Sequence, residues 1–595
     1  MTEATMVAAD LPRFDRHFWD GTFRFTRIGK GSLGGKAGGL VGIKDLLSDK
    51  VDRAAFPGFT VEVPTMAVIA TGFFDEFMAR NRLSDLAFET MPDNLIGHAF
   101  QRAELPVELL GDLRALIEQV KTPLAIRSSS LLEDALERPF AGVYATKMIP
   151  NNQFDPDTRF RKLLEAIKLV YASTYFGKAR DYIVTTGRHP REEKMAVIIQ
   201  EVVGRRHGDR FYPDISGVAR SVNFYPSWPA RPEDGVASLA LGLGKTIVDG
   251  GIAWTFSPAF PKRPPTFKSM EEMLRNTQTE FWAVNMGEPP AYDAVNEEEH
   301  LVLAGLSEAE ADEVLHRAAS TWDADSRILV PGVRPFGTPV VNFAPLLENG
   351  CVPLSGLICA LLRAAEDAVG AKVEIEFAVT FEQRRGQPLS TRLGFLQVRP
   401  MTSPQETVEV TPEDLGDGRA IVASDMVIGN AVIDDIYDIV FVRPERFSNS
   451  CTAAVAQQVS AINRELLARQ RPYLLIGFGR WGSSQRTLGI PVAWSQISGA
   501  RAIVESTLPQ MSADLSQASH FFHNLSSFRA TYFMVRHDRR PGIDWEWLQQ
   551  QPAAEETEYV RHVRLTAPLL VRVDGRSARG VILAPQRARA EGQQP

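Results

Sequence analysis

Two segments near residue 400 predict a pair of β-strands that bring four polar side chains together. Residues 372–377 alternate between polar and apolar side chains, and residues 393–400 follow as a second strand. The polar side chains are those of Glu374, Glu376, Gln397 and Arg399. If the strands pair, the two glutamates share one face, because side chains alternate along a strand. Carboxylate and amide oxygens suit Mg²⁺ and a guanidinium suits phosphate, so the pattern favours phosphoryl transfer. A solvated acidic strand face is the alternative interpretation.

A second polar segment is Arg127-Ser-Ser-Ser-Leu-Leu-Glu-Asp134, which is followed by Pro-Phe-Ala-Gly at 139–142. A permanently charged guanidinium, three hydroxyls and two carboxylates form a set suited to polyphosphate and its magnesium. An ordinary serine-rich loop that ends at Gly142 is the alternative. Residues 124–126 predict a short strand that leads into Arg127.

A glycine-rich segment, residues 28–40, contains Lys36 and leads into a helix predicted over 41–47. Glycines let backbone amides approach an anion, and the start of a helix favours negative charge. The segment is not a Walker loop, because Ala37 follows the lysine where Ser or Thr would be required.

The apolar run 195–203 predicts a buried strand that is interrupted by Gln200 and Glu201. Buried polar groups need partners, and the edge of an adenine ring offers both a donor and an acceptor. Bonding to neighbouring backbone, or a place on an edge strand, explains them equally well. Leu163, Ile167 and Val170 recur at helical spacing and predict a core helix.

The overall composition is that of a multidomain enzyme without a nucleic-acid or membrane partner. A length of 595 residues predicts three or four modules. A net charge of -8 argues against a nucleic-acid binder, which normally carries a basic stripe. The three cysteines are widely spaced and indicate neither disulfides nor zinc. With no secretory signal pattern and no apolar run of roughly 18 residues, we expect a soluble, cytoplasmic protein.

Changes in composition divide the chain further. We expect a flexible N-terminus over 1–19, a nucleotide-binding domain over 20–403, a linker over 404–418, an α/β module over 419–575 and a mobile tail over 576–595. Within the large domain, residues of about 260–345 are charged and predict a helical insertion.

Taken in order along the chain, these segments resemble the nucleotide-binding part of the phosphoenolpyruvate synthase and pyruvate phosphate dikinase family. The resemblance covers residues 20–403, and further segments in family order are 170–182, Gly242-Leu-Gly244 and Leu396-Gln-Val-Arg-Pro400. It implies an α/β ATP-grasp fold, in which two lobes hold the nucleotide.

The resemblance also implies roles for individual residues. Lys36 and Arg127 would bind the phosphates of ATP, and the strand containing Gln200 would meet adenine. Glu376 and Gln397, with Glu374 beside them, would hold Mg²⁺, and Arg399 would steady the transferred phosphate. The further residues expected to line the nucleotide site are Asp134, Glu201, Gly242, Gly244 and Lys245.

The chain departs from the family pattern in three places. Lys245 stands where the synthases usually have Glu, and Glu374 replaces the usual Asp. The family also passes phosphate to a histidine on a swivelling domain and then to pyruvate in a barrel domain. Neither the histidine motif nor room for a barrel of about 250 residues is found after residue 403, so we do not expect pyruvate phosphorylation by this chain alone.

The module over 419–575 resembles the end of uncharacterised bacterial synthase-like proteins and brings no known chemistry. Gly477-Phe-Gly-Arg-Trp-Gly482 spells GxGxxG, for which a plain strand and loop, an anion loop using Arg480 and Ser483, and a dinucleotide site are all considered. His520 follows a serine and is a candidate phosphocarrier, as is His523 less strongly; a structural histidine is the alternative.

These features favour an ATP- and Mg²⁺-dependent phosphotransferase that loads phosphate on a histidine or on another acceptor. The acceptor is a small molecule or a phosphoacceptor protein, and a homo-oligomer is compatible with the sequence. A catalytically silent nucleotide-binding regulator and a direct small-molecule kinase or ligase are the alternatives. The joint presence of Lys36, Arg127, Glu376, Gln397 and Arg399 favours catalysis, since binding alone would not need every metal and phosphate ligand.

Overall fold

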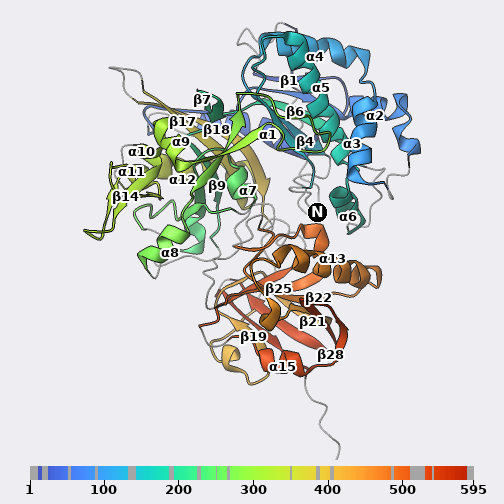
Figure 1. The fold of residues 1–595 in the computed structure, drawn as a ribbon, viewed down its shortest axis with the longest axis vertical. Helices are drawn as coiled ribbons and strands as arrows, with labels where there is room; N and C mark the ends of the chain where they lie inside the picture. The colour runs from blue at the N-terminus through green and yellow to red at the C-terminus, as the bar shows by residue number, and fades with distance from the viewer. Residues whose placement is uncertain are drawn as a thin grey trace, which may run out of the picture. The chain divides into compact units, whose positions relative to one another are not determined.

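The computed structural model describes residues 11–16, 24–50, 55–86, 91–130, 143–185, 193–223, 229–249, 251–263, 269–348, 352–383, 389–401, 408–483, 488–508, 530–538, 542–575 and 577–585. The chain forms two compact units, Met1–Val248 with Ile252–Met401 and Asp249–Gly251 with Thr402–Pro595. We call them unit 1 and unit 2 (Figure 1). The length of the chain predicts three or four modules, whereas the structure has two compact units.

The first sheet of unit 1 has five strands in the order β1-β3-β6-β4-β5. Their bounds are Phe25–Ile28, Met66–Ile69, Met195–Glu201, Leu124–Ser130 and Thr146–Ile149. The strands predicted at 124–126 and 195–203 are therefore confirmed, and β4 continues through the serines. Helix α5 (Pro156–Ser173) packs against this sheet, and α2 (Thr71–Arg80), α3 (Asp93–Arg102) and α4 (Val107–Gln119) lie around it. Asp155 caps the start of α5, and Leu163, Ile167 and Val170 are buried, as their helical spacing predicts.

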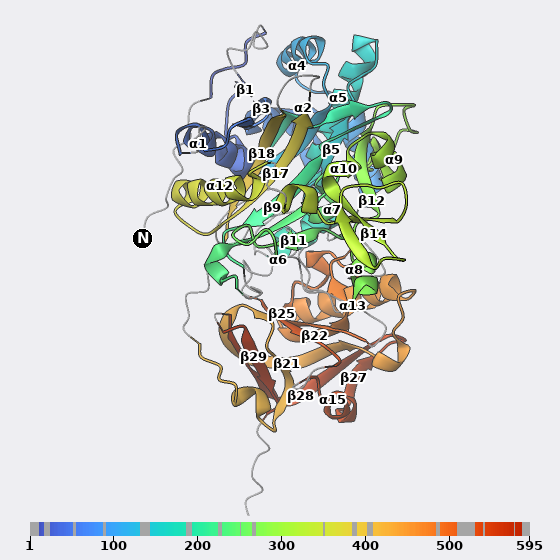
Figure 2. The ribbon, with the colours of Figure 1, turned by 90° about the vertical axis from the view of Figure 1, so that its left-hand side faces the viewer.

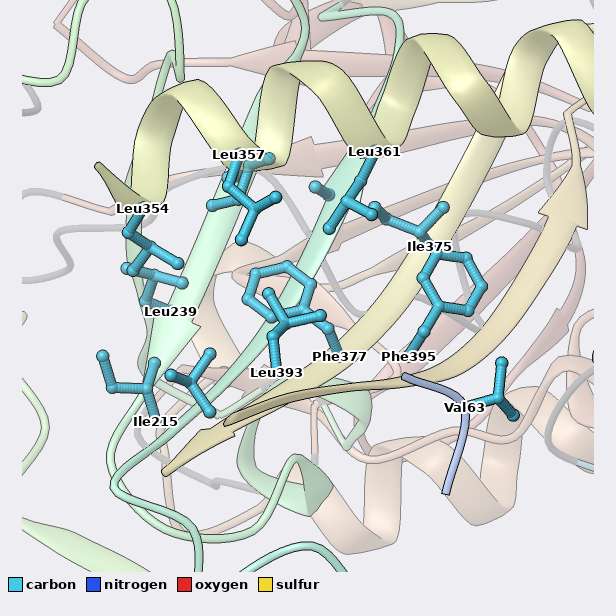
Figure 3. Close-up of a cluster of buried hydrophobic side chains, with 14 of the residues drawn as sticks. Val63, Ile215, Leu239, Leu354, Leu357, Leu361, Ile375, Phe377, Leu393 and Phe395 are labelled. Carbon is cyan, nitrogen blue, oxygen red and sulfur yellow. The ribbon is translucent and has the colours of Figure 1, made fainter. Parts of the chain in front are cut away.

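The second sheet of unit 1 has six strands in the order β11-β10-β9-β17-β18-β2. Their bounds are Trp254–Phe256, Val236–Ala240, Ile215–Arg220, Val373–Glu382, Ser390–Pro400 and Phe59–Glu62. Helix α12 (Leu354–Val369) lies across this sheet and directs Leu357 and Leu361 toward Phe377 and Phe395 (Figure 3). The predicted pairing of two strands near residue 400 is confirmed, because β17 and β18 are antiparallel neighbours.

Helix α1 (Gly34–Lys50) joins the two sheets, since it contacts β4 and β6 of the first and β18 and β2 of the second. One continuous apolar core contains Val68 and Ile198 of the first sheet and Phe377 of the second. Because the two lobes share this core, they form one compact unit.

The segment expected to be a helical insertion is built mostly from strands. A four-stranded sheet has the order β13-β12-β8-β7, and a three-stranded sheet has the order β15-β14-β16. Figure 2 labels one strand of each, β12 and β14. The bounds are β7 Arg205–His207, β8 Arg210–Tyr212, β12 Glu280–Asn285, β13 Leu301–Gly305, β14 Ala319–Asp323, β15 Ile328–Pro331 and β16 Thr338–Val341. The accompanying helices are short: α8 Met270–Arg275, α9 Leu306–Ala311, α10 Leu315–Ala318 and α11 Ala344–Leu347. The helical expectation is corrected, because the charged residues are shared among turns, short strands and helices of only four to six residues.

Unit 2 is an α/β unit around a nine-stranded sheet in the order β19-β29-β28-β21-β22-β25-β26-β20, with β27 paired to β28. The bounds are β19 Ala420–Ser424, β20 Val427–Ile428, β21 Asn430–Val442, β22 Tyr473–Phe478, β25 Ala500–Ser506, β26 Thr531–Val535, β27 Ala553–Glu556, β28 Val560–Asp574 and β29 Arg579–Leu583. The neighbours β21, β22, β25 and β26 are parallel. Helix α13 (Thr452–Ala468) connects the first two, and α15 (Trp545–Gln550) contributes to the core.

The ends of the units differ from the boundaries expected from composition. In the predicted linker, Val408 and Val410 are buried in a core cluster with Val581 and Leu583, so its described part belongs to unit 2. Val581 and Leu583 lie in β29, within the segment predicted as a mobile tail. Near the N-terminus, the amide of Phe14 donates to the carbonyl of Arg27, so residues 11–16 pack beside β1. In the described part of the chain, no helix is both long and apolar enough to cross a membrane.

Candidate functional site

Arg127 makes polar contacts with residues of both sheets of unit 1. It lies in β4, and its Nη1 donates to the carbonyl of Leu396 at 2.9 Å and to Oε1 of Gln200 at 3.2 Å. Its Nη2 donates to Oε1 of Gln397 at 2.7 Å and lies 3.7 Å from a carboxylate oxygen of Glu376. The guanidinium thus joins β4 and β6 to β18 and β17, which are far apart in the sequence.

The antiparallel register of β17 and β18 sets the positions of the four polar residues predicted there. Glu374 lies opposite Arg399, and Glu376 lies opposite Gln397. Nη2 of Arg399 lies 2.9 Å from Oε1 of Glu376, and its Nη1 donates to Oε1 of Glu374 at 3.3 Å. The predicted juxtaposition is therefore present, and most of these groups are buried. A solvated strand face does not describe them.

Arg220 is a member of this cluster that the sequence reasoning missed. It lies at the end of β9, opposite Glu374 on β17, and its Nε donates to Oε2 of that glutamate at 2.7 Å. The result is a row of alternating charges: Arg220, Glu374, Arg399, Glu376, Arg127. One signal could have found it, namely an arginine within the otherwise apolar and small residues of 215–220.

Lys36 lies in the first turn of α1, not in a loop before the helix. Its Nζ is 3.5 Å from Oγ of Ser128, the residue after Arg127. The start of a helix carries partial positive charge, so the lysine and the helix both favour an anion here. Gly34 begins the helix at φ +76°, and a Cβ on it would lie 1.9 Å from the carbonyl oxygen of Ser129. Glycine is therefore required where α1 approaches β4.

The serines after Arg127 are buried, and Ser129 joins β4 to the start of α1 through hydrogen bonds. Oγ of Ser129 accepts from the amide of Ala37 at 3.0 Å and donates to the carbonyl of Leu33 at 2.8 Å. All three serines are buried within β4. The alternative of an ordinary serine-rich loop is corrected for 127–130, which lie in β4. Asp134 lies outside the described residues.

Gln200 and Glu201 point to opposite faces of β6, as successive strand residues do. Gln200 faces Arg127, and within the described part of the chain its buried Nε2 has no hydrogen-bond partner. Glu201 instead lies 3.4 Å from a guanidinium nitrogen of Arg392, which also binds Glu62. The structure therefore brings the first residue to the Arg127 cluster and leaves the second outside it.

The segment Gly242-Leu-Gly-Lys245 lies between β10 and α7 (Lys245–Val248) and touches a different part of unit 1. The carbonyl of Gly242 accepts from Oγ of Ser216 at 2.7 Å. Nζ of Lys245 lies 2.8 Å from Oε1 of Glu298 and 5.7 Å from the centre of the Trp282 ring. The lysine that stands where synthases usually have Glu is thus matched by an acidic partner within the chain.

In unit 2 the GxGxxG segment forms a strand and a turn. The amides of residues 479–482 donate, in order, to Ser506 O, Leu488 O, Glu505 Oε1 and Ile490 O. These four amides are all used inside the protein, which disfavours an anion loop. A Cβ on Gly477 would lie 2.3 Å from the ring of Trp481, so this glycine makes room for the indole. His520 and His523 lie outside the described residues.

The donor set fits a magnesium ion held together with phosphate oxygens. Among the described residues, no group of three or more His, Cys, Asp or Glu side chains could hold a metal unaided. Magnesium at nucleotide sites usually takes one or two carboxylates, with water and phosphate oxygens completing the shell. Glu376 on β17 and Gln397 on β18 are directly paired across the two strands, and each supplies a hard oxygen donor. Nη2 of Arg399 lies 2.9 Å from Oε1 of Glu376, whereas Oε2 is 3.7 Å from Arg127, beyond hydrogen-bond distance, which leaves Oε2 for a cation.

Two sheets joined by a helix and by arginine contacts, with a lysine in the first turn of that helix and acidic donors near Arg127, are the features of an ATP-grasp type of nucleotide-binding fold. The model of the family described as pyruvate phosphate dikinase, AMP/ATP-binding domain, matches residues 30–417. The chain belongs to this family, and unit 1 is an ATP-binding domain. A comparison with curated proteins gave no match.

Proposed function

We propose that this chain is an ATP- and Mg²⁺-dependent phosphotransferase of the phosphoenolpyruvate synthase and pyruvate phosphate dikinase type. It would transfer phosphate from ATP to a histidine or to another acceptor. The observation that carries the proposal is the set of contacts that Arg127 makes with Gln397 and Glu376, on a strand whose next residue, Ser128, lies 3.5 Å from Nζ of Lys36. Phosphoryl transfer depends mainly on such positioning and on neutralisation of charge.

The charges of the cluster support an anionic ligand. Three cations, Arg127, Arg220 and Arg399, face two carboxylates, Glu374 and Glu376. The excess positive charge complements Mg²⁺-bound ATP, which carries about two negative charges at neutral pH. A buried cluster with excess positive charge raises the free energy of the folded protein unless an anion binds, because charges removed from water need compensation.

The residues divide the work as follows. Arg127 and Lys36 bind and orient the phosphates. Arg399 lies two residues after Gln397 on β18, opposite Glu374, and contacts both Glu374 and Glu376. Glu376 and Gln397 would hold the magnesium, which supplies neutralisation of phosphate charge when bound. The burial of these groups excludes water and strengthens their electrostatic effect.

The acceptor is proposed to be a small molecule or a phosphoacceptor protein, with His520 as a candidate acceptor within the chain. Neither a nucleic acid nor a membrane is proposed as a partner, and a cytoplasmic location belongs to the same proposal. A homo-oligomer is compatible with it.

The test is to identify the products formed from ATP labelled at the β- or γ-phosphate in the presence of Mg²⁺. AMP and phosphate, with acid-labile label on the protein, are the expected result. ADP as the sole product would contradict the dikinase type and favour a direct kinase or ligase. Tight ATP binding without turnover, under all acceptor conditions, would favour a regulator.

A further inference from the structure

Glu374 is enclosed by two arginines, although the sequence predicts it as a metal ligand. Its Oε2 accepts from Nε of Arg220 at 2.7 Å, and its Oε1 accepts from Nη1 of Arg399 at 3.3 Å. The exposed fractions of the three side chains are 2% for Glu374, 7% for Arg220 and 2% for Arg399. Both carboxylate oxygens are thus already bound to permanent cations.

The backbone fixes this arrangement. Arg220 on β9 is in register with Glu374 on β17, and Glu374 is in register with Arg399 on β18. Three side chains at one register position of neighbouring strands project to the same face of the sheet. The row therefore results from strand pairing, and a change of rotamer at one residue would leave a buried charge without its partner.

Glu376, two residues further along β17, is placed differently. Its side chain is 13% exposed, and Oε1 receives no hydrogen bond although Nη2 of Arg399 lies 2.9 Å away. Its Oε2 is 3.7 Å from Arg127. A guanidinium lies near each oxygen of Glu376 as well, but the 3.7 Å to Arg127 is beyond hydrogen-bond distance and the side chain is more exposed, which leaves Oε2 for a divalent cation. Both oxygens of Glu374, in contrast, accept hydrogen bonds from arginines.

We infer that Glu374 is a positioning residue and not a metal ligand, and that Arg220 is the residue that holds it in this role. The Arg220–Glu374 pair fixes the guanidinium of Arg399 so that its Nη2 is directed toward Glu376. This inference rests on the proposed function and deepens it, because it reduces the protein ligands of the metal among these residues to Glu376 and Gln397.

The experiment measures Mn²⁺ binding by electron paramagnetic resonance of the free ion, with the protein and the non-hydrolysable analogue β,γ-imido-ATP. The variants are Glu374→Gln and Arg220→Gln, with Glu376→Gln as the matched control. The control should weaken Mn²⁺ binding by about tenfold or more, while the other two stay within about twofold of the parent. Weakening by Glu374→Gln equal to that of the control would overturn the inference.

ATP cleavage by the same variants tests the positioning role. Glu374→Gln and Arg220→Gln should each slow cleavage by about tenfold to a hundredfold, and the double variant should be no slower than either single one. Arg220→Lys should recover part of the rate, because it keeps the charge. Parental rates in Arg220→Gln would remove Arg220 from this role. If the parent protein itself does not cleave ATP, the proposed function fails, but the Mn²⁺ comparison still decides the role of Glu374.

Discussion

Arg399 shows how a buried charge combines a functional role with a structural one. Its guanidinium lies between two carboxylates, those of Glu374 and Glu376, and is 2% exposed. Removal of a buried partner leaves uncompensated charge, so truncation of this side chain acts on folding as well as on chemistry. Variants that keep the charge are therefore the informative ones.

We predict that Arg399→Ala lowers the free energy of unfolding by about 3 to 5 kcal/mol, because two buried carboxylates lose their cation. Arg399→Lys should cost much less stability but still slow ATP cleavage by about a hundredfold, since a lysine cannot face both carboxylates through a planar fork. Urea unfolding and the product assay measure the two effects. A stable Arg399→Ala protein with full activity would place the residue outside the site.

His300 is buried near Lys147, Glu299 and Lys162, and neither ring nitrogen has a hydrogen-bond partner among the residues that the structure describes. Burial is the main cause that lowers its pKa from 6.5 to about 4; both lysines act in the same direction and Glu299 opposes them. The unfolded chain binds this proton near pH 6.5, whereas the folded chain binds it only near pH 4. Stability is therefore fully present above pH 6.5 and falls as the pH decreases toward 4.

We predict that this one group removes about 3 kcal/mol of stability between pH 6.5 and 4. His300→Leu should flatten that part of the curve and change stability little at pH 7, because no side-chain hydrogen bond is lost. Urea unfolding at a series of pH values provides the measurement. His98→Gln, at an exposed position on α3, serves as the control. An unchanged slope in His300→Leu would assign the acid sensitivity to other groups.

At the scale of elements, the site depends on how closely α1 approaches β4. We predict that Gly34→Ala lowers stability by about 3 kcal/mol and weakens ATP binding, because both the positive φ and the overlap with Ser129 displace the helix that carries Lys36. Gly38→Ala is the matched control in the same helix. A Cβ there meets nothing within 4 Å, so stability should rise by about 0.5 to 1 kcal/mol. Thermal unfolding and ATP titration compare the two; equal effects would contradict this account.

Some elements could be predicted from the sequence and others could not, for physical reasons. Strands β4, β6, β17 and β18 have clear apolar or alternating patterns, so the pairing that delivers Glu376 and Gln397 could be predicted. The pairing of Arg220 with Glu374 could not be predicted, because it depends on the register between two strands about 150 residues apart in the sequence. A single arginine in a sequence does not indicate which strand lies beside it. Strands β12–β16 were missed because they are short, and β12 pairs with β8 about 70 residues earlier.

At the scale of the whole molecule, each unit has its own apolar core, and the family match falls mainly on unit 1. We predict that Mg²⁺ with β,γ-imido-ATP, at about 100 times its Kd, stabilises unit 1 by about 2.7 kcal/mol. Amide hydrogen exchange should show added protection in β4, β18 and α1 and little change in the sheet of unit 2. Equal protection of β22 and β25 would indicate a second nucleotide-responsive region.

The guanidinium of Arg127 donates to Gln397, Gln200 and Leu396. An incoming nucleotide must therefore compete with internal acceptors, and its net affinity is the difference between two sets of bonds. Phosphate oxygens can win this exchange, because hydrogen bonds between charged groups are about twice as strong as neutral ones. Adenosine has no such oxygens and would leave the internal bonds in place. We therefore expect the site to discriminate nucleotides from nucleosides.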